Sequence, residues 1–103
     1  MIIYVGIDGT ICNGNLSDHK LVPSVENIQK MNKLYDEGHQ IIYWSNRGST
    51  TGKYWLATTI TQFEEWGVKY TQVKSGRPFY DVFIDSKNIK TVSDLFIPPI
   101  SPQ

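Results

Sequence analysis

The sequence predicts a single α/β domain with a mainly parallel sheet of about four strands. Short apolar, β-branched runs alternate along the chain with segments whose apolar residues recur at helical spacing. Glycines follow several of these segments, where a strand or helix would end. Because strand, helix and strand follow one another, we expect right-handed crossovers and neighbouring strands that run parallel.

The first half of the chain contains one predicted strand and one predicted helix. Residues 2–5 form a buried strand that ends at Gly6, and the polar residues 13–21 form a loop. Pro23 is expected at the first position of the helix, which ends near Gly38. Its apolar residues at helical spacing are Val25, Ile28, Met31 and Leu34.

The second half continues the alternation. Residues 41–44 form the next strand, and a second helix ends at Gly67. Residues 68–70 are expected to form a brief strand, and residues 82–84 a stronger one that ends at Asp85. The clearest helical spacing in this half is that of Thr59, Phe63 and Trp66.

Composition narrows the class of protein. We expect one core domain at 1–96 and a Pro-rich tail at 97–103 that cannot continue a helix. Ten basic residues balance ten acidic ones, so no excess of charge suggests a nucleic-acid partner. The apolar run 2–5 is too short to span a membrane. Cys12 is the single cysteine, which excludes an internal disulfide and fits a reducing compartment, so we expect a cytoplasmic protein.

Polar residues follow each predicted strand. In open parallel sheets, ligands bind outside the carboxyl ends of the strands, so the segments 6–10, 45–48 and 85–87 are the first candidates for a site. Asp8 leaves the first strand, and Gly9 permits a sharp turn after it. Taken alone, this segment is equally well interpreted as an ordinary polar turn.

Three segments resemble, in order, the motifs of haloacid dehalogenase (HAD) superfamily phosphatases. Residues 5–11 are similar to the first signature, DxDGT followed by Ile or Leu, and residues 42–48 to the second, an apolar strand ending in Ser or Thr. Residues 83–87 resemble the last motif, an apolar strand ending in acidic residues. The resemblance implies an HAD-like, Rossmannoid three-layer sandwich without a cap domain. The segments that look like the small branch of capsule-biosynthesis phosphatases are 35–39, 65–70 and 76–81.

The resemblance also implies a role for each matching residue. In the family, an aspartate at the position of Gly6 attacks phosphorus, and an aspartate at the position of Asp8 is the general acid and base. A basic residue at the position of Arg77 holds the nucleophile and phosphate together. Mg²⁺ is expected between the backbone carbonyl of Asp8 and the carboxylate of Asp85. The residues expected to bind phosphoryl oxygens are Gly9, Thr10, Ser45, Asn46 and Arg47.

Three positions depart from the family pattern. Gly6 replaces the nucleophile and can neither attack phosphorus nor offer a carboxylate to Mg²⁺. Arg77 replaces a lysine, and its forked guanidinium is not equivalent to an ammonium; Lys74 is an alternative for that place. Ser86 replaces a second acidic residue after Asp85. All three departures fall in the expected site.

Two functions follow as hypotheses. The first is Mg²⁺-dependent hydrolysis of phosphomonoesters, impaired or lost because of Gly6. The second is a non-catalytic module that binds a phosphorylated ligand or a partner protein. Phosphoryl transfer to another nucleophile is a third, weaker alternative. Since no cap is inserted, the expected site is open, which favours a large phosphorylated substrate or closure by another copy of the chain.

Overall fold

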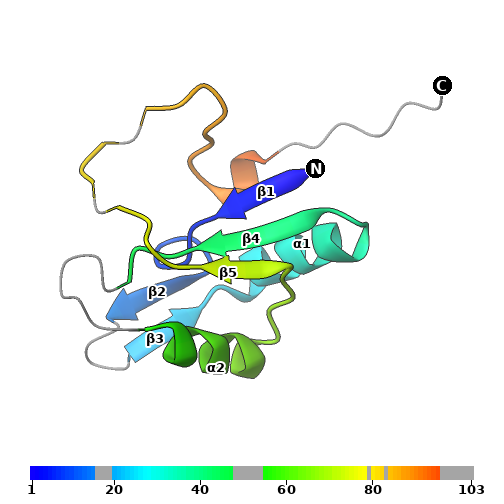
Figure 1. The fold of residues 1–103 in the computed structure, drawn as a ribbon. Helices are drawn as coiled ribbons and strands as arrows, with labels where there is room; N and C mark the ends of the chain where they lie inside the picture. Colours follow the sequence, from blue (N-terminus) through cyan, green and yellow to red (C-terminus); the bar gives the residue numbers. More distant parts are fainter. Residues whose placement is uncertain (16–19, 48–54, 79, 83, 96–103) are drawn as a thin grey trace.

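The computed structural model describes residues 1–15, 20–47, 55–78, 80–82 and 84–95 (Figure 1). The strands in this part of the chain are β1 (Ile2–Val5), β2 (Cys12–Asn15), β3 (Lys20–Pro23), β4 (Gln40–Trp44) and β5 (Gln72–Lys74). The helices are α1 (Val25–Asp36), α2 (Leu56–Trp66) and the short 3₁₀ helix η1 (Val92–Asp94).

The central element is a parallel sheet. Its three strands within the described residues lie in the order β1-β4-β5. Tyr4 lies opposite Ile42, and Tyr43 lies opposite Val73. The prediction of a mainly parallel sheet is therefore confirmed. Because all three strands point the same way, the loops that follow them meet at one edge (Figure 1).

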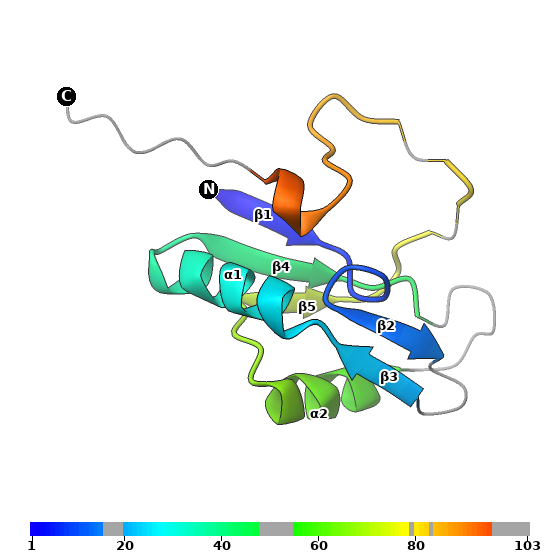
Figure 2. The same ribbon diagram turned by 180° about the vertical axis from the view of Figure 1, so that it is seen from behind.

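The two α-helices pack on one face of this sheet. Ile41 and Tyr43 are fully buried and share one core with Ile28 of α1 and Phe63 of α2. Figures 1 and 2 show α1 lying across one face, behind the strands in one view and in front of them in the other. On the opposite face Tyr4 is 51% exposed. The described residues thus form two layers, not the three that the resemblance implies, because no α-helix follows β5 within them.

A hairpin replaces the loop predicted at 13–21. β2 and β3 pair antiparallel, with Cys12 opposite Pro23 and Asn13 opposite Val22. The sequence does not predict this pairing, because the residues of β2 (Cys-Asn-Gly-Asn) are mostly polar. Pro23 ends β3 rather than starting a helix, which an edge strand tolerates because the missing N–H is not needed there. Helix α1 begins one residue after Ser24, its N-cap.

The third strand of the sheet starts later than predicted. The segment 68–70 connects α2 to the sheet, and β5 follows it at Gln72–Lys74. Val68 is buried in the core without belonging to a strand. Thr71 makes the junction: its backbone N–H donates to the carbonyl oxygen of Ile41, and its Oγ1 accepts from the N–H of Ile41. The apolar residues of this segment thus indicate burial and not strand pairing.

No strand is present at Val82 or Ile84, and Phe83 lies outside the described residues. These two side chains are 74% and 91% exposed. They belong to a loop that extends away from the sheet between β5 and η1 (Figures 1 and 2). An apolar, β-branched run forms a strand only when it pairs with a sheet edge, and in the described chain this run does not reach one.

The helix ends follow the prediction. α1 ends at Asp36, shortly before Gly38, and α2 ends at Trp66, capped by Gly67 in a left-handed backbone conformation (φ 68°). Further along, η1 packs beside α1, where Nζ of Lys30 donates to the carbonyl oxygens of Val92 (2.9 Å) and Leu95 (3.2 Å). The core extends to Val92, inside the predicted domain 1–96, and the tail 97–103 lies outside the described residues.

Candidate functional site

The loop after β1 brings polar groups to the carboxyl edge of the sheet. Its turn depends on Gly9, whose φ of 81° is the left-handed conformation that side chains disfavour. The backbone N–H of Gly9 donates to the carbonyl oxygen of Cys12 (2.8 Å), and that of Thr10 to the carbonyl oxygen of Ile7 (3.1 Å). This tight turn fixes Asp8 and Thr10 beside Gly6.

Asp8 forms an ion pair with Arg47, which follows β4. Arg47 Nε donates to Asp8 Oδ2 (2.9 Å), and Nη2 donates to Asp8 Oδ1 (3.0 Å). The side chain of Arg47 is 2% exposed and that of Asp8 is 37% exposed. A two-pronged contact of this kind is the geometry in which guanidinium and carboxylate bind most strongly. Arg47 therefore holds Asp8 as an oriented carboxylate.

The rest of the Arg47 guanidinium is also occupied. Nη1 donates to Thr59 Oγ1 (2.8 Å) and Gln62 Oε1 (2.7 Å), and Nη2 lies 4.0 Å from Cys12 Sγ. A guanidinium has five N–H groups, and all five are directed at protein acceptors. Arg47 was expected to bind phosphate, but in this arrangement it supports Asp8 instead.

Ser45 joins the ends of β4 and β5. Its backbone N–H donates to the carbonyl oxygen of Lys74 (2.8 Å), and its carbonyl oxygen accepts from the N–H of Arg77 (3.0 Å). The Ser45 Oγ accepts a hydrogen bond from the backbone N–H of Arg47 (2.9 Å), so its own proton remains for another acceptor. Asn46 is exposed beside it.

The guanidinium of Arg77 lies beside Gly6. A Cβ at position 6 would lie 2.8 Å from Arg77 Nη1 and 3.2 Å from Thr10 Oγ1. The guanidinium carbon of Arg77 is 5.7 Å from the ring centre of Trp44 and 5.3 Å from that of Tyr80. Arg77 Nη2 also donates to the Tyr80 hydroxyl. The guanidinium therefore borders the space that a side chain at position 6 would occupy.

Lys74, the alternative to Arg77, has another contact. Its Nζ donates to the hydroxyl of Tyr4 (3.1 Å) and lies 5.5 Å from the centre of that ring. Tyr4 is on the open face of the sheet, away from the helices. The structure thus brings Arg77, and not Lys74, to Gly6.

The described residues do not fit a magnesium site. Mg²⁺ takes charged oxygen ligands, but Gly6 offers none, and the cationic Arg77 borders its place. Asp85 is exposed in the loop after β5, where Oδ1 accepts from the backbone N–H of Lys87 (3.4 Å). Within the part of the chain that the structure describes, no group of three His, Cys, Asp or Glu side chains is placed to share a metal ion.

Cys12 is a hydrogen-bond donor to the site and not a nucleophile. Burial, and then the neighbouring charge of Asp8, raise the pKa of its thiol from 9.0 to about 11. The Sγ lies 3.5 Å from Asp8 Oδ1 and 3.7 Å from the carbonyl oxygen of Ile7. At neutral pH the thiol keeps its proton and contributes a weak donor to Asp8.

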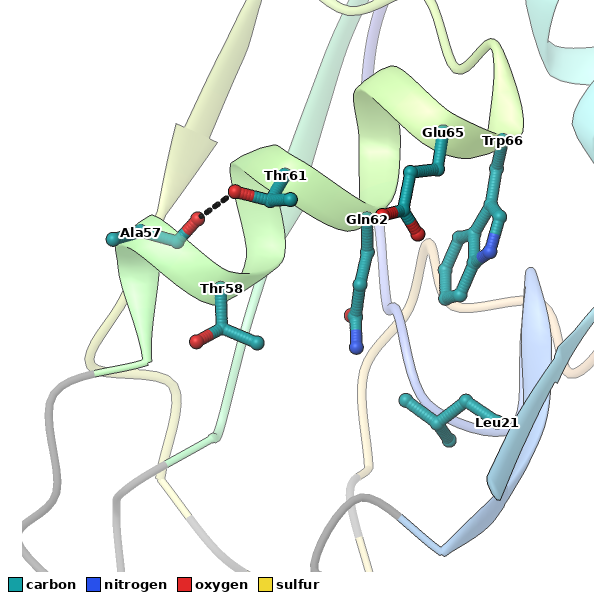
Figure 3. A pocket seen from close by; sticks show the side chains of 7 residues that line it. All are labelled: Leu21, Ala57, Thr58, Thr61, Gln62, Glu65 and Trp66. Atoms are coloured by element: carbon teal, nitrogen blue, oxygen red, sulfur yellow. Dashed lines mark hydrogen bonds between the residues drawn. The ribbon is translucent and has the colours of Figure 1, made fainter. Parts of the chain in front are cut away.

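A groove runs beside this site between β3 and α2 (Figure 3). Its volume is about 450 Å³. The side chain of Gln62 lies in it while its Oε1 accepts from Arg47, so one residue joins the groove to the ion pair. The residues that line it are Leu21, Ala57, Thr58, Thr61, Gln62, Glu65 and Trp66.

The sequence alone does not identify Thr59, Gln62 or Tyr80 as site residues. For Thr59 a signal exists: it shares a helix face with Phe63, and a buried hydroxyl requires a hydrogen-bond partner. Gln62 and Tyr80 give no comparable signal, because their roles depend on where Arg47 and Arg77 place their guanidinium groups.

The fold and site define a small parallel α/β protein with its polar groups at the carboxyl edge of the sheet. The solved structures contain a protein of similar fold, a structural genomics target from Vibrio cholerae, with a TM-score of 0.78 and 18% identity. The similarity covers 86% of this chain and 82% of that one. No family model matches the sequence, and no curated protein matches it. The comparison therefore shows the fold.

Proposed function

We propose that this chain binds the phosphate group of a phosphorylated ligand at the carboxyl edge of its sheet, as an HAD-like, phosphatase-related protein. One observation carries the proposal: the Arg77 guanidinium and the Thr10 hydroxyl lie together beside Gly6, where a Cβ would be 2.8 Å from Nη1 and 3.2 Å from Oγ1. Guanidinium and hydroxyl groups are the donors that phosphate oxygens prefer. Ser45, with its free hydroxyl proton, ends the neighbouring strand.

Gly6 removes the covalent route of the resembling phosphatases. Uncatalysed phosphomonoester hydrolysis is so slow that enzymes accelerate it by up to ~10²¹-fold. Active sites that have lost their nucleophile keep roughly 10³–10⁴-fold acceleration from the groups that remain. A remainder of that size does not sustain a working phosphatase. Binding is therefore favoured over turnover.

A second candidate function is hydrolysis by direct attack of water. The geometry of Asp8 favours it, because Arg47 orients the carboxylate that would act as general base. The exposed third of the Asp8 side chain leaves a water molecule access to it.

A phosphomonoesterase assay separates the two candidates. We expect no turnover of p-nitrophenyl phosphate, with or without Mg²⁺, by the unmodified chain. Gly6→Asp restores some turnover with Mg²⁺, and Gly6→Asn, which offers an oxygen but no nucleophile, restores none. Robust hydrolysis by the unmodified chain that Asp8→Asn abolishes would instead establish water attack.

The proposal also includes the number of strands in the sheet and the location of the protein in the cell. We expect the HAD-like sheet to contain about four strands, of which three lie among the described residues. No helix among the described residues has the length and apolar character needed to cross a bilayer. A cytoplasmic protein, open to closure by a second copy, agrees with the single cysteine.

A further inference from the structure

The groove between β3 and α2 combines a row of polar groups with an apolar wall (Figure 3). Thr58, Gln62 and Glu65 share one face of α2, since residues three and four apart are neighbours on a helix. The Gln62 side chain and the Trp66 ring point from α2 toward Leu21 of β3 (Figure 3). The volume of about 450 Å³ is within the range of about 300–1,000 Å³ typical of small-molecule pockets. The groove can therefore hold one small molecule.

The amide of Gln62 is held in one orientation. Its Oε1 accepts a hydrogen bond of 2.7 Å from Nη1 of Arg47, whose side chain is 2% exposed. Because the oxygen is bound to a buried guanidinium, the amide nitrogen is the atom that Gln62 offers to a ligand. Figure 3 shows this nitrogen at the tip of the side chain, directed into the groove. Gln62 thus supplies N–H donors from a fixed position.

The other polar groups restrict the chemistry of the ligand. Glu65 is negative, and among the described residues no cation lines the groove, so an anion is disfavoured there. The Thr61 hydroxyl donates to the carbonyl oxygen of Ala57 (3.0 Å), so toward a ligand it accepts, as the Glu65 carboxylate does. An ammonium group would satisfy these acceptors but could not accept from Gln62. A hydroxyl group both donates and accepts, so this lining favours an uncharged ligand with several hydroxyl groups.

Trp66 and Leu21 form the apolar wall. Both side chains pack against the hydrophobic core, so they are ordered before a ligand arrives and lose little entropy when they contact it. The face of an indole ring is electron-rich and attracts C–H groups that carry a partial positive charge. A sugar ring has such C–H groups on one face and hydroxyl groups around its rim. It therefore matches both parts of the groove.

We propose that this groove binds an uncharged sugar ring, with Gln62 Nε2 as donor, the Glu65 carboxylate as acceptor and the Trp66 ring as the apolar surface. The inference goes beyond the proposed function, because it concerns another place on the protein and does not depend on phosphate binding. Binding makes and breaks no covalent bond.

NMR titration of the isotope-labelled full chain with glucose, galactose, mannose and N-acetylglucosamine tests the inference. We expect at least one sugar to shift the signals of the Trp66 indole N–H and the Gln62 amide, with a Kd of about 1–10 mM. Gln62→Glu should weaken binding about 5-fold or more, because it removes the N–H donors while still offering Arg47 an oxygen. Glu65→Ala should weaken it similarly. Glu64→Ala, which removes the same charge from the neighbouring exposed position outside the groove, should leave binding unchanged.

Several results would overturn the inference. One is the absence of shifts at Trp66 and Gln62 with all four sugars up to about 100 mM. Another is tighter binding of choline or caffeine, which would assign the groove to a cation or to a planar heterocycle. A third is undiminished sugar binding by Gln62→Glu, or by Glu65→Ala if the first variant does not fold.

Titration of the same samples with inorganic phosphate separates this inference from the proposed function. Phosphate binding without sugar binding would overturn the inference alone. Sugar binding without phosphate binding would support the inference and overturn the proposed function. Absence of both, in a chain whose thermal unfolding remains cooperative, would overturn both.

Discussion

Replacing Arg47 by methionine should destabilise the protein more than any surface substitution. The change removes the two-pronged contact to Asp8 and leaves Thr59 and Gln62 without their shared donor. Breaking a buried ion pair costs about 3–5 kcal/mol, but the Asp8 side chain is 37% exposed, so water screens part of the pair. We therefore expect Arg47→Met to lower the free energy of unfolding by about 2–3 kcal/mol.

Urea unfolding followed by circular dichroism measures this cost, and a double-mutant cycle isolates the pair. Asp8→Asn should also destabilise, because it leaves Arg47, 2% exposed, without a countercharge. The double variant should cost less than the sum of the two, with a coupling energy of about 1–3 kcal/mol. Additive effects, or a loss below roughly 0.5 kcal/mol for Arg47→Met, would show that the ion pair does not hold the site together.

Two other stability changes follow from single buried groups. Tyr43→Phe should raise the free energy of unfolding by about 1 kcal/mol, because the buried Tyr43 hydroxyl has no hydrogen-bond partner within the described residues; a clear loss of stability on urea unfolding would contradict this. The free energy of unfolding should fall by about 2–3 kcal/mol between pH 9 and pH 11 because of Cys12. Burial raises the pKa of this thiol from 9.0 in the unfolded chain to about 11 in the folded protein. As the pH rises, the thiol of the unfolded chain therefore loses its proton first, which favours unfolding. Cys12→Ala should flatten that part of the pH profile, and an unchanged profile would count against it.

The sequence predicts the sheet because its signals are local and repeated. The apolar run of β4 is buried between β1 and β5, so composition alone marks it, whereas the run of β1, predicted to be a buried strand, lies at the edge of the described sheet with Ile2 and Tyr4 exposed. The hairpin β2–β3 escapes prediction, since its residues are polar and the pairing partner lies across a turn. In the segment 82–84 the opposite happens. Its β-branched residues predict a strand, but Val82 and Ile84 are exposed and pair with no sheet edge among the described residues.

The candidate site is predicted in its positions but not in its contacts. Alternation of strands and helices is enough to foresee Asp8 and Ser45 at one edge, whereas Arg77 was expected there only from the family resemblance. Side-chain geometry decides that Arg47 pairs with Asp8 and that Arg77 lies beside Gly6. In the sequence alone, both Arg47 and Arg77 are candidate ligands for phosphate. In the structure, all five N–H groups of Arg47 are directed at protein acceptors, whereas the guanidinium of Arg77 lies beside Gly6.

The two arginines at the carboxyl edge of the sheet differ in what their guanidinium groups contact. Arg47 pairs with Asp8 and also donates to Thr59 and Gln62 of α2. Arg77 follows β5, and its guanidinium fills the place beside Gly6, since a Cβ at position 6 would lie 2.8 Å from Nη1. A lysine at position 77 would lack the planar guanidinium, whose carbon lies 5.7 Å from the ring centre of Trp44 and 5.3 Å from that of Tyr80.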